Sequence, residues 1–271
     1  MKLLVGTDFS ENAQNAMDFA LQLAKAHNSS ITLLFAYTPV YDFAAQTAEY
    51  ITTVEQQATK ELKSLTKKCK KEGIEIDYLI EQTTPSSAIC SVADRESFDL
   101  IILGSQGKSD FPSKIFGSTT SEVIRLSSTP VLTVPAGAAF KAMDNISLAM
   151  ELNREDIVFL GQLIALTRHY RLPYQIIYIK KDEDSLPEMP FSELSMYLKD
   201  RFPELVISFD TLAADRVDEG LKQYTQQHPR TMLSMFSKHQ GFFDYLFRTS
   251  HCADMALHTT VPLLVLKSKK F

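Results

Sequence analysis

Two short glycine segments carry the clearest chemical signal in this sequence. Gly104-Ser105-Gln106-Gly107 is followed, after nine further residues, by Gly117-Ser118-Thr119. Because glycine lacks a Cβ, the backbone can turn sharply there and bring several N–H groups toward one ligand. A helix that starts at the second segment would add unpaired N–H donors and a partial positive charge. The spacing therefore predicts a cradle for phosphates; the alternative is that these glycines only allow tight turns between a strand and a helix.

Two other phosphate motifs do not fit this loop. A Walker A loop ending in Gly107-Lys108-Ser109 needs a glycine at position 102, where the sequence has Ile102. The Gly-x-Gly-x-x-Gly pattern of dinucleotide-binding folds is absent. Lys108 could approach a phosphate, or it could be an ordinary solvated lysine of a loop.

The elements that would position this loop alternate between apolar runs and amphipathic stretches. The apolar runs predict strands at Lys2–Gly6, 31–37, 74–80, 100–103 and Val131–Val134. Helical spacing predicts helices after an N-cap at Ser10, over 51–69, over 86–97 and over Ser118–Leu126. Such alternation favours a parallel sheet with right-handed crossovers, and runs that are apolar throughout favour a sheet covered on both faces. Each half of the chain is therefore expected to be a doubly wound α/β layer.

The second half of the chain repeats this order of elements. Strands are predicted at 146–150, 174–179, 205–209, 232–235 and 263–266. Residues 99–134 align with 231–266 at an offset of 132 (231 − 99), whereas Asp8 aligns with Glu151 at an offset of 143 (151 − 8). The difference predicts a shorter second helix in the second half. We expect domains at 1–138 and 139–271, joined by the small and flexible residues of 135–144.

Composition and charge fit a soluble protein of about two domains. The chain has 271 residues, of which 45% are hydrophobic and 23% charged, and its formal net charge is −5. This acidic balance does not resemble the basic surface of a generic nucleic-acid binder, and no apolar run approaches the ~18 residues of a membrane helix. The early carboxylate Asp8 does not fit a signal peptide, and three distant cysteines favour reduced thiols. We expect a cytoplasmic protein with neither a nucleic-acid nor a membrane partner.

The glycine loop and its surroundings resemble those of the universal stress protein family. The run GSQGKSDFPSKIFGST at 104–119 resembles the family's G-x2-G-x9-G-(S/T) nucleotide loop. VGTDFSENA at 5–13 resembles its first strand and Asp turn, LLFAYTPV at 33–40 its second strand, and SSTPVLTVP at 127–135 its closing segment. The resemblance covers nearly all of residues 1–135 and continues more weakly through 145–268, as in tandem members of the family.

This resemblance implies two tandem doubly wound domains, each a five-stranded parallel sheet in the order 3-2-1-4-5 flanked by helices, and a site for ATP, AMP or ADP. In that order strands one and four are neighbours, and open α/β sheets bind ligands in the crevice at their carboxyl ends. Mg²⁺ could come with the nucleotide, because nucleotide phosphates usually carry it, but the sequence shows no dedicated carboxylate pair for the metal. Carried over by position, the nucleotide-binding residues are Thr7, Asp8, Ala36, Gly104, Ser105, Gln106, Gly107, Gly117, Ser118 and Thr119. Asp8 could instead only fix its own turn by accepting hydrogen bonds from backbone N–H groups.

The second domain has lost the glycines at the corresponding positions. At the offset of 132, Gly104 becomes Phe236, Gly107 becomes His239 and Gly117 becomes Thr249. We expect this degenerate domain to keep the fold without this mode of nucleotide binding. Its histidines show no spacing typical of a metal site, and its apolar loop residues could either cover their own sheet or meet a partner.

These features favour an ATP-binding protein of stress response or signalling, in which the bound state carries the information. A slow ATPase or phosphotransferase, and a scaffold whose first site is vestigial, are the alternatives. No catalytic residue is assigned, because no Ser-His-Asp or Cys-His order stands out. The expected partners are a nucleotide and an unidentified protein. The two domains should form an intramolecular pseudo-dimer through Val131–Val134 and 263–266, and two chains could form a further homodimer.

Overall fold

A computed structural model describes residues 1–39, 44–105, 118–180, 187–237 and 260–267 of the chain. The chain divides into two compact units, Met1–Phe140 (unit 1) and Lys141–Phe271 (unit 2). None of the helices in these described ranges combines the length and the hydropathy needed to cross a bilayer.

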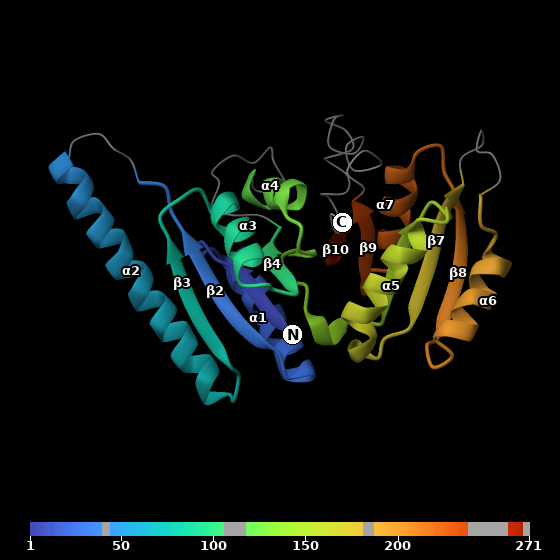
Figure 1. Ribbon diagram of the computed structural model, residues 1–271, viewed down its shortest axis with the longest axis horizontal. Helices are drawn as coiled ribbons and strands as arrows, with labels where there is room; N and C mark the ends of the chain where they lie inside the picture. Colours follow the sequence, from blue (N-terminus) through green and yellow to red (C-terminus); the bar gives the residue numbers. More distant parts are fainter. Residues whose placement is uncertain (40–43, 106–117, 181–186, 238–259, 268–271) are drawn as a thin grey trace. The chain divides into compact units, whose positions relative to one another are not determined.

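Unit 1 is a five-stranded parallel sheet covered by helices on both faces. Its strands are β1 (Lys2–Gly6), β2 (Ser30–Ala36), β3 (Ile76–Glu81), β4 (Leu100–Gly104) and β5 (Val131–Val134), and they lie in the order β3-β2-β1-β4-β5. Its helices are α1 (Glu11–His27), α2 (Ala44–Lys71), α3 (Pro85–Arg95) and α4 (Ser118–Leu126). In Figure 1, α3 and α4 lie in front of the sheet and α1 lies behind it. This is the order 3-2-1-4-5 that the resemblance implied.

Unit 2 has the same topology. Its strands are β6 (Asn145–Met150), β7 (Tyr174–Lys180), β8 (Ile207–Ala213), β9 (Thr231–Ser237) and β10 (Leu263–Lys267), and they lie in the order β10-β9-β6-β7-β8. Its described helices are α5 (Asp156–Thr167), α6 (Phe191–Arg201) and α7 (Val217–Gln227), with a short 3-10 turn, η2 (Arg168–Tyr170), after α5. Counted from its own first strand, the order is again 3-2-1-4-5.

The strand register confirms the internal repeat residue by residue. Leu3 pairs with Leu100 in unit 1, and Ile146 pairs with Met232 in unit 2. The two offsets are therefore 143 (146 − 3) and 132 (232 − 100), as the sequence predicted. The helix between the second and third strands has 28 residues in unit 1 and 11 in unit 2, a shortening of 17 (28 − 11) that longer flanking segments reduce to the net change of 11 in the offset.

Two backbone features also recur at matched positions. Phe9 and Leu152, which are 143 residues apart (152 − 9), have φ angles of 60° and 59°. Asn28 and Arg171, at the same separation, have φ angles of 49° and 55°. Residues other than glycine rarely adopt this left-handed conformation, so these shared values show that the two units keep the same turns as well as the same strands.

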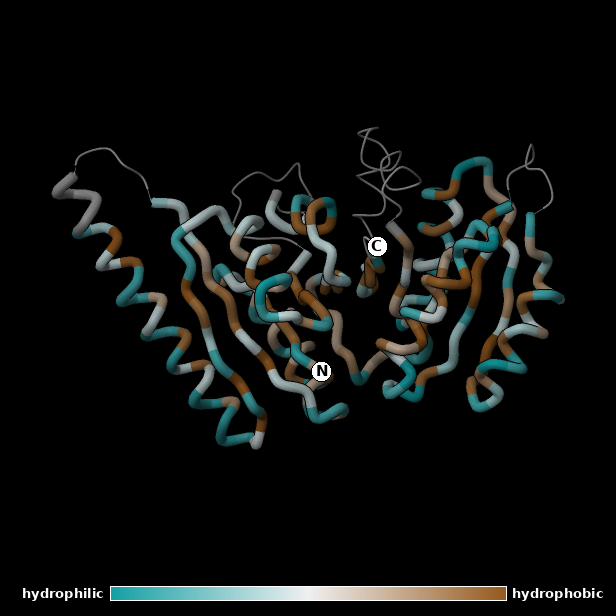
Figure 2. Tube along the Cα trace, in the orientation of Figure 1, coloured by the Kyte–Doolittle hydropathy of each residue, from teal (hydrophilic) through white to brown (hydrophobic). Residues whose placement is uncertain are grey.

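The core of each unit consists of strand residues buried on both faces. Leu3, Leu4 and Val5 are completely buried in unit 1, as are Leu148 and Ile177 in unit 2. Along the strands the colouring of Figure 2 is predominantly hydrophobic. Each such side chain contributes about 1.5–3 kcal/mol relative to an exposed one, so the continuous apolar runs are what stabilise these sheets.

The connection between the units is less free than its composition suggested. Asn15 Nδ2 donates a hydrogen bond of 2.8 Å to the carbonyl oxygen of Pro135. Phe140, which begins a 3-10 turn, η1 (Phe140–Ala142), packs edge-on against Phe19 of α1, with the ring centroids 5.7 Å apart. The first part of the expected linker is therefore fastened to unit 1.

Candidate functional site

The candidate site lies where β2, β1 and β4 end side by side. Gly6 of β1 pairs with Leu34 of β2, and Val5 pairs with Ile102 of β4. Because the strands are parallel, their carboxyl ends meet at one edge of the sheet. Thr7, Asp8, Ala36 and Gly104 follow or end these strands, so the structure brings these four predicted site residues to the same edge.

The turn that follows β1 is held by its own polar side chains. Thr7 Oγ1 accepts a hydrogen bond from Phe9 N–H (3.1 Å), and Asp8 Oδ1 accepts one from Ser10 N–H (3.0 Å). The turn hydrogen bond that the sequence offered as an alternative role for Asp8 is therefore present. A carboxylate can accept about four hydrogen bonds, so a role in fixing the turn and a role in binding a ligand are compatible.

Ser10 then starts α1 as an N-cap, as its sequence context predicted. Its hydroxyl oxygen accepts a hydrogen bond from Ala13 N–H at 3.2 Å. This places the first turn of α1, with its unpaired N–H groups, next to the ends of β1 and β4.

Gly104 is explained by a close approach of two backbone segments. A Cβ on Gly104 would lie 2.8 Å from the carbonyl oxygen of Asn12 and 3.2 Å from the amide nitrogen of Ala13, both in α1. Real Cβ atoms essentially never come within 3.0 Å of a backbone atom, so the contact with the Asn12 oxygen excludes a side chain here unless α1 moves. The first glycine of the loop is therefore required by the packing of α1 on β4, whether or not a ligand binds.

The two ends of the glycine loop are joined by a hydrogen bond. Thr120, in the first turn of α4, donates from its buried hydroxyl to the carbonyl oxygen of Gly104 at 3.1 Å. Ser105 N–H donates to the carbonyl oxygen of Val134 at 3.0 Å, so this amide belongs to the sheet. The loop thus leaves β4 and returns to the same point, where α4 begins. Sequence reasoning missed Thr120, although the run Ser118-Thr119-Thr120 is a signal for a helix start.

Removing the hydroxyl of Thr120 should weaken this closure. We expect Thr120→Val to lower the free energy of unfolding of unit 1 by about 1 kcal/mol, because one buried hydrogen bond is lost and the Gly104 carbonyl loses a partner. Thr120→Ser should recover most of the stability. Urea unfolding of the three proteins checks this, and equal midpoints for all three would contradict it.

The other predicted site residues divide into two groups. Ala36, Ser105 and Thr119 are half-buried at the same edge of the sheet. Gln106, Gly107 and Gly117 lie outside the described residues, as does Lys108, and Ser118 is described only as the first residue of α4. The roles assigned to this second group remain predictions from the sequence.

An aromatic row borders the site and was not foreseen. Phe9 lies against Phe35 with the ring centroids 5.0 Å apart, and Phe35 stacks on Tyr37 at 6.2 Å. Tyr37 in turn donates from its hydroxyl group to Glu55 of α2 at 3.1 Å. The row ties the turn after β1 to β2 and α2, and its signal in the sequence is the i, i+2 spacing of Phe35 and Tyr37.

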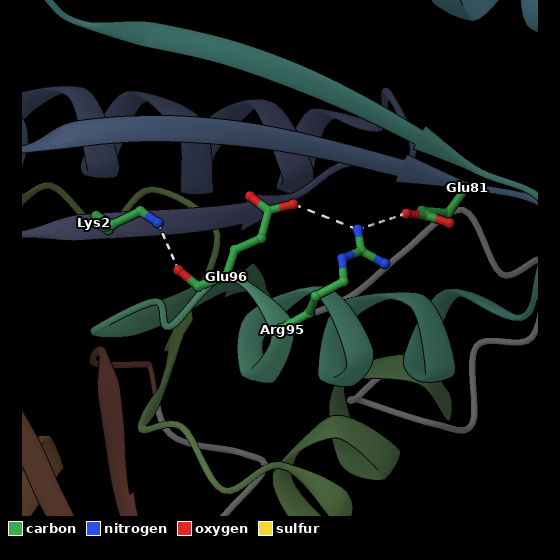
Figure 3. A network of polar contacts seen from close by, with 4 residues as sticks. All are labelled: Lys2, Glu81, Arg95 and Glu96. Atoms are coloured by element: carbon green, nitrogen blue, oxygen red, sulfur yellow. Dashed lines mark hydrogen bonds and ion pairs between the residues drawn. The ribbon is translucent and has the colours of Figure 1, made fainter.

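A polar network on another part of unit 1 links the end of α3 to β1 and β3 (Figure 3). Arg95 contacts Glu81 at the end of β3 (3.1 Å) and Glu96 (3.4 Å), and Lys2 Nζ donates to the carbonyl oxygen of Glu96 (2.5 Å). Hydrogen bonds to these two carboxylates raise the pKa of Arg95. Exposed ion pairs of this kind contribute little to stability, and we assign the network no part in the site.

In unit 2 a ring fills the position that corresponds to Gly104. Phe236 is 7% exposed and stacks on Phe159 of α5 with the ring centroids 4.6 Å apart. Glu151 replaces Asp8 and begins the corresponding turn. Its backbone N–H group donates a hydrogen bond of 3.1 Å to Oδ2 of the buried Asp156. Side chains therefore occupy places where unit 1 has close backbone contacts. His239, Thr249 and Ser250 lie outside the described residues.

A buried polar cluster elsewhere in unit 2 offers no second site. Ser147 shares hydrogen bonds of 2.7 Å with Tyr224 and with Thr231, and Tyr224 donates to Gln175, also at 2.7 Å. Burial raises the pKa of the Tyr224 phenol further above neutral. Because these groups satisfy one another in the interior, the cluster is structural.

Within the described ranges there is also no group of three or more His, Cys, Asp or Glu residues that could hold a metal ion.

Comparisons with known proteins agree with this geometry. The model of the universal stress protein family matches residues 1–135. A universal stress protein of Synechocystis is 30% identical over 136 residues, which are 49% of this chain and 84% of that protein. A crystal structure of a universal stress protein from Archaeoglobus fulgidus matches 99% of this chain over 98% of its own length, with 17% sequence identity. The TM-score of 0.78 shows that the two proteins share a fold. A universal stress protein solved in complex with cAMP is 27% identical, covers 49% of this chain and 96% of its own, and has a TM-score of 0.38.

Proposed function

Because this chain belongs to the universal stress protein family, we propose that unit 1 binds one adenine nucleotide, ATP or its products AMP and ADP, at the crevice between β1 and β4. We further propose a cytoplasmic role in stress response or signalling, in which the bound state, and not turnover, is read by a partner protein. Unit 2 keeps the fold and does not bind a nucleotide at the corresponding place.

This proposal rests on one observation. The two ends of the glycine loop meet at the topological switch point of the sheet, the place where the strand order reverses. The hydrogen bond from Thr120 to Gly104 shows that α4 begins next to the carboxyl end of β4, so the chain on both sides of the loop lies at this one point. That strand neighbours β1, whose end carries Asp8. Open α/β sheets bind ligands where adjacent strands send their connections to opposite sides, and β1 and β4 meet this condition.

The residues present fit a nucleotide at this edge. The first turn of α4 presents N–H groups that have no acceptor within the helix, and the Thr119 hydroxyl group lies in the same turn; both suit phosphate oxygens. Gln106, Gly107 and Gly117 would supply the rest of the phosphate cradle. On the other side, Thr7, Asp8 and Ala36 would face the nucleoside. Mg²⁺, if bound, would be held mainly by the phosphates.

The proposal is tested by identifying what the purified protein binds. Mass spectrometry of small molecules released by denaturation, followed by calorimetric titration with ATP, ADP, AMP and cAMP, should show one site per chain. If no nucleotide is released and none binds, the site is vestigial and the chain is a scaffold. The titration also distinguishes ATP from the other nucleotides.

Turnover of bound ATP should be slow. Hydrolysis requires an oriented water, a base and stabilisation of charge on the transferred phosphoryl group. The loop offers backbone N–H groups for the third requirement, but we assign no base, since Asp8 is expected on the nucleoside side. A cradle that stabilises ground state and transition state equally does not accelerate the reaction. We therefore expect a rate below the ~1 s⁻¹ at the lower end of typical enzymes.

Steady-state phosphate release from the pure protein measures this rate. A rate above that level, lost in Asp8→Ala, would show that unit 1 is an ATPase or phosphotransferase.

A further inference from the structure

The outer face of α2 carries lysines that the nucleotide site does not use. Lys60, Lys63, Lys67, Lys70 and Lys71 recur at spacings of three and four residues, which places them on one side of the helix. All five are exposed, and we refer to them as the lysine stripe. At 1.5 Å per residue the stripe is about 16 Å long.

The opposite side of α2 is fixed to the sheet, so the lysine stripe faces away from unit 1. Ala58, Leu62 and Cys69 are at most 3% exposed. In Figure 1, α2 lies beside the edge strand β3, and in Figure 2 hydrophilic and hydrophobic residues alternate along it. The apolar side of this helix is therefore already in use, and only its charged side is available to a partner.

The charge of the stripe is not cancelled locally. Residues 1–140 contain 12 Lys and Arg against 16 Asp and Glu, yet six of those 12 cations fall within positions 60–71, where Glu61 is the single acid. Glu72, just beyond the helix, is engaged with Lys25 at 2.5 Å, and this hydrogen bond lowers the pKa of Glu72. Within the described part of the chain, no carboxylate pairs with a lysine of the stripe.

Because the stripe consists of lysines alone, it suits some anionic partners better than others among proteins, nucleic acids and anionic bilayers. Protein interfaces are depleted in lysine and depend on aromatic or arginine anchors, which the stripe lacks. Sequence-specific or single-strand binding to nucleic acid adds amides that read base edges or aromatic rings that stack on bases, and the stripe has neither. Non-specific binding of its lysines to nucleic acid phosphates is measured with the DNA duplex in the test below. An anionic bilayer requires no shape complementarity; it attracts clusters of four to eight lysines, and each lysine adds roughly fivefold to binding.

We propose that the lysine stripe docks unit 1 reversibly on a bilayer rich in anionic phospholipid. The surface potential falls off within a Debye length of about 8 Å, so the bilayer senses the projecting stripe more strongly than the acidic remainder of the unit. Binding is electrostatic and without insertion, because α2 keeps its apolar side against β3. This departs from the expectation that the chain has no membrane partner, which rested on net charge and on the absence of an apolar span.

Vesicle co-sedimentation tests this docking with the full chain. The probes are vesicles of pure phosphatidylcholine and vesicles with 40% phosphatidylserine, at low salt and at physiological salt. The test variant is Lys60→Gln, Lys63→Gln, Lys67→Gln, Lys71→Gln. The matched control removes four exposed lysines of unit 2 instead, Lys141→Gln, Lys180→Gln, Lys199→Gln and Lys222→Gln, and so has the same net charge.

We expect the wild-type protein and the control to bind the anionic vesicles in a salt-dependent way, and the stripe variant to bind them at least about tenfold more weakly. Circular dichroism verifies that both variants are folded. Equal loss in the control, equal binding to neutral vesicles, or no binding to either would overturn the proposal. Tighter binding to a 20-base-pair DNA duplex than to vesicles, at equal phosphate concentration, would also overturn it.

Discussion

Replacing Gly117 by valine should abolish nucleotide binding by the whole chain. Gly117 is the last glycine of the loop and directly precedes α4, whose first N–H groups would meet the phosphates. A β-branched side chain would restrict the turn and block the approach of the ligand. We expect an affinity at least about 100-fold lower, which is 2.7 kcal/mol at 25 °C. Calorimetry with the nucleotide that the purified protein releases measures the change.

The matched control is Thr249→Val, which makes a similar replacement at the position in unit 2 that is 132 residues further on. Because unit 2 should not bind a nucleotide there, its affinity and stoichiometry should equal those of the unchanged chain. Two equivalent sites per chain, or an unaltered affinity in Gly117→Val, would show that the loop is not the binding site.

Replacing Gly104 by alanine should destabilise unit 1 even without a ligand. The new Cβ would lie 2.8 Å from the carbonyl oxygen of Asn12 and 2.9 Å from its carbonyl carbon. These are backbone atoms of α1, so relief requires moving the helix, and overpacking of this kind costs about 1–3 kcal/mol. Thermal unfolding should show a midpoint lower by several degrees.

Gly161→Ala provides the control for the chemical change itself. Gly161 lies inside α5, and a Cβ there meets nothing within 4 Å. Alanine favours a helix over glycine by about 0.5–1 kcal/mol, so this variant should be slightly more stable. A Gly104→Ala protein as stable as the unchanged chain would mean that α1 can shift freely and that its packing does not determine this glycine.

Most strands could be predicted because buried parallel strands have continuous apolar sequences. Lys2–Gly6 and Val131–Val134 were predicted to the residue, and the offsets of the repeat agree with the strand register. The third strand of the second half was placed too early, at 205–209 instead of Ile207–Ala213. This is the edge strand of unit 2, and no residue of it is fully buried, so its Asp210 and Thr211 gave no apolar signal.

The candidate site was only partly readable from the sequence. Residue types pointed to Asp8 and Gly104, but the same types also serve local packing, and the structure shows both a turn hydrogen bond and a close backbone contact. Thr120 and the aromatic row from Phe9 to Tyr37 depend on which helices meet which strand ends. Such contacts join segments far apart in the chain, and no local pattern contains them.

The matched left-handed residues separate the framework that both units share from the glycine loop that only the sequence of unit 1 carries. Phe9 and Leu152 each hold a bulky side chain in a conformation that costs about 1–3 kcal/mol, yet only Phe9 belongs to the unit with the glycine loop. A strained turn that persists where the loop has changed is not maintained by the loop's ligand. The turn therefore belongs to the framework that the two units share, and it needs no glycine loop in the same unit to keep its conformation. Removing the glycine loop from unit 1 should therefore leave this turn, and the strands that it joins, as they are in unit 2.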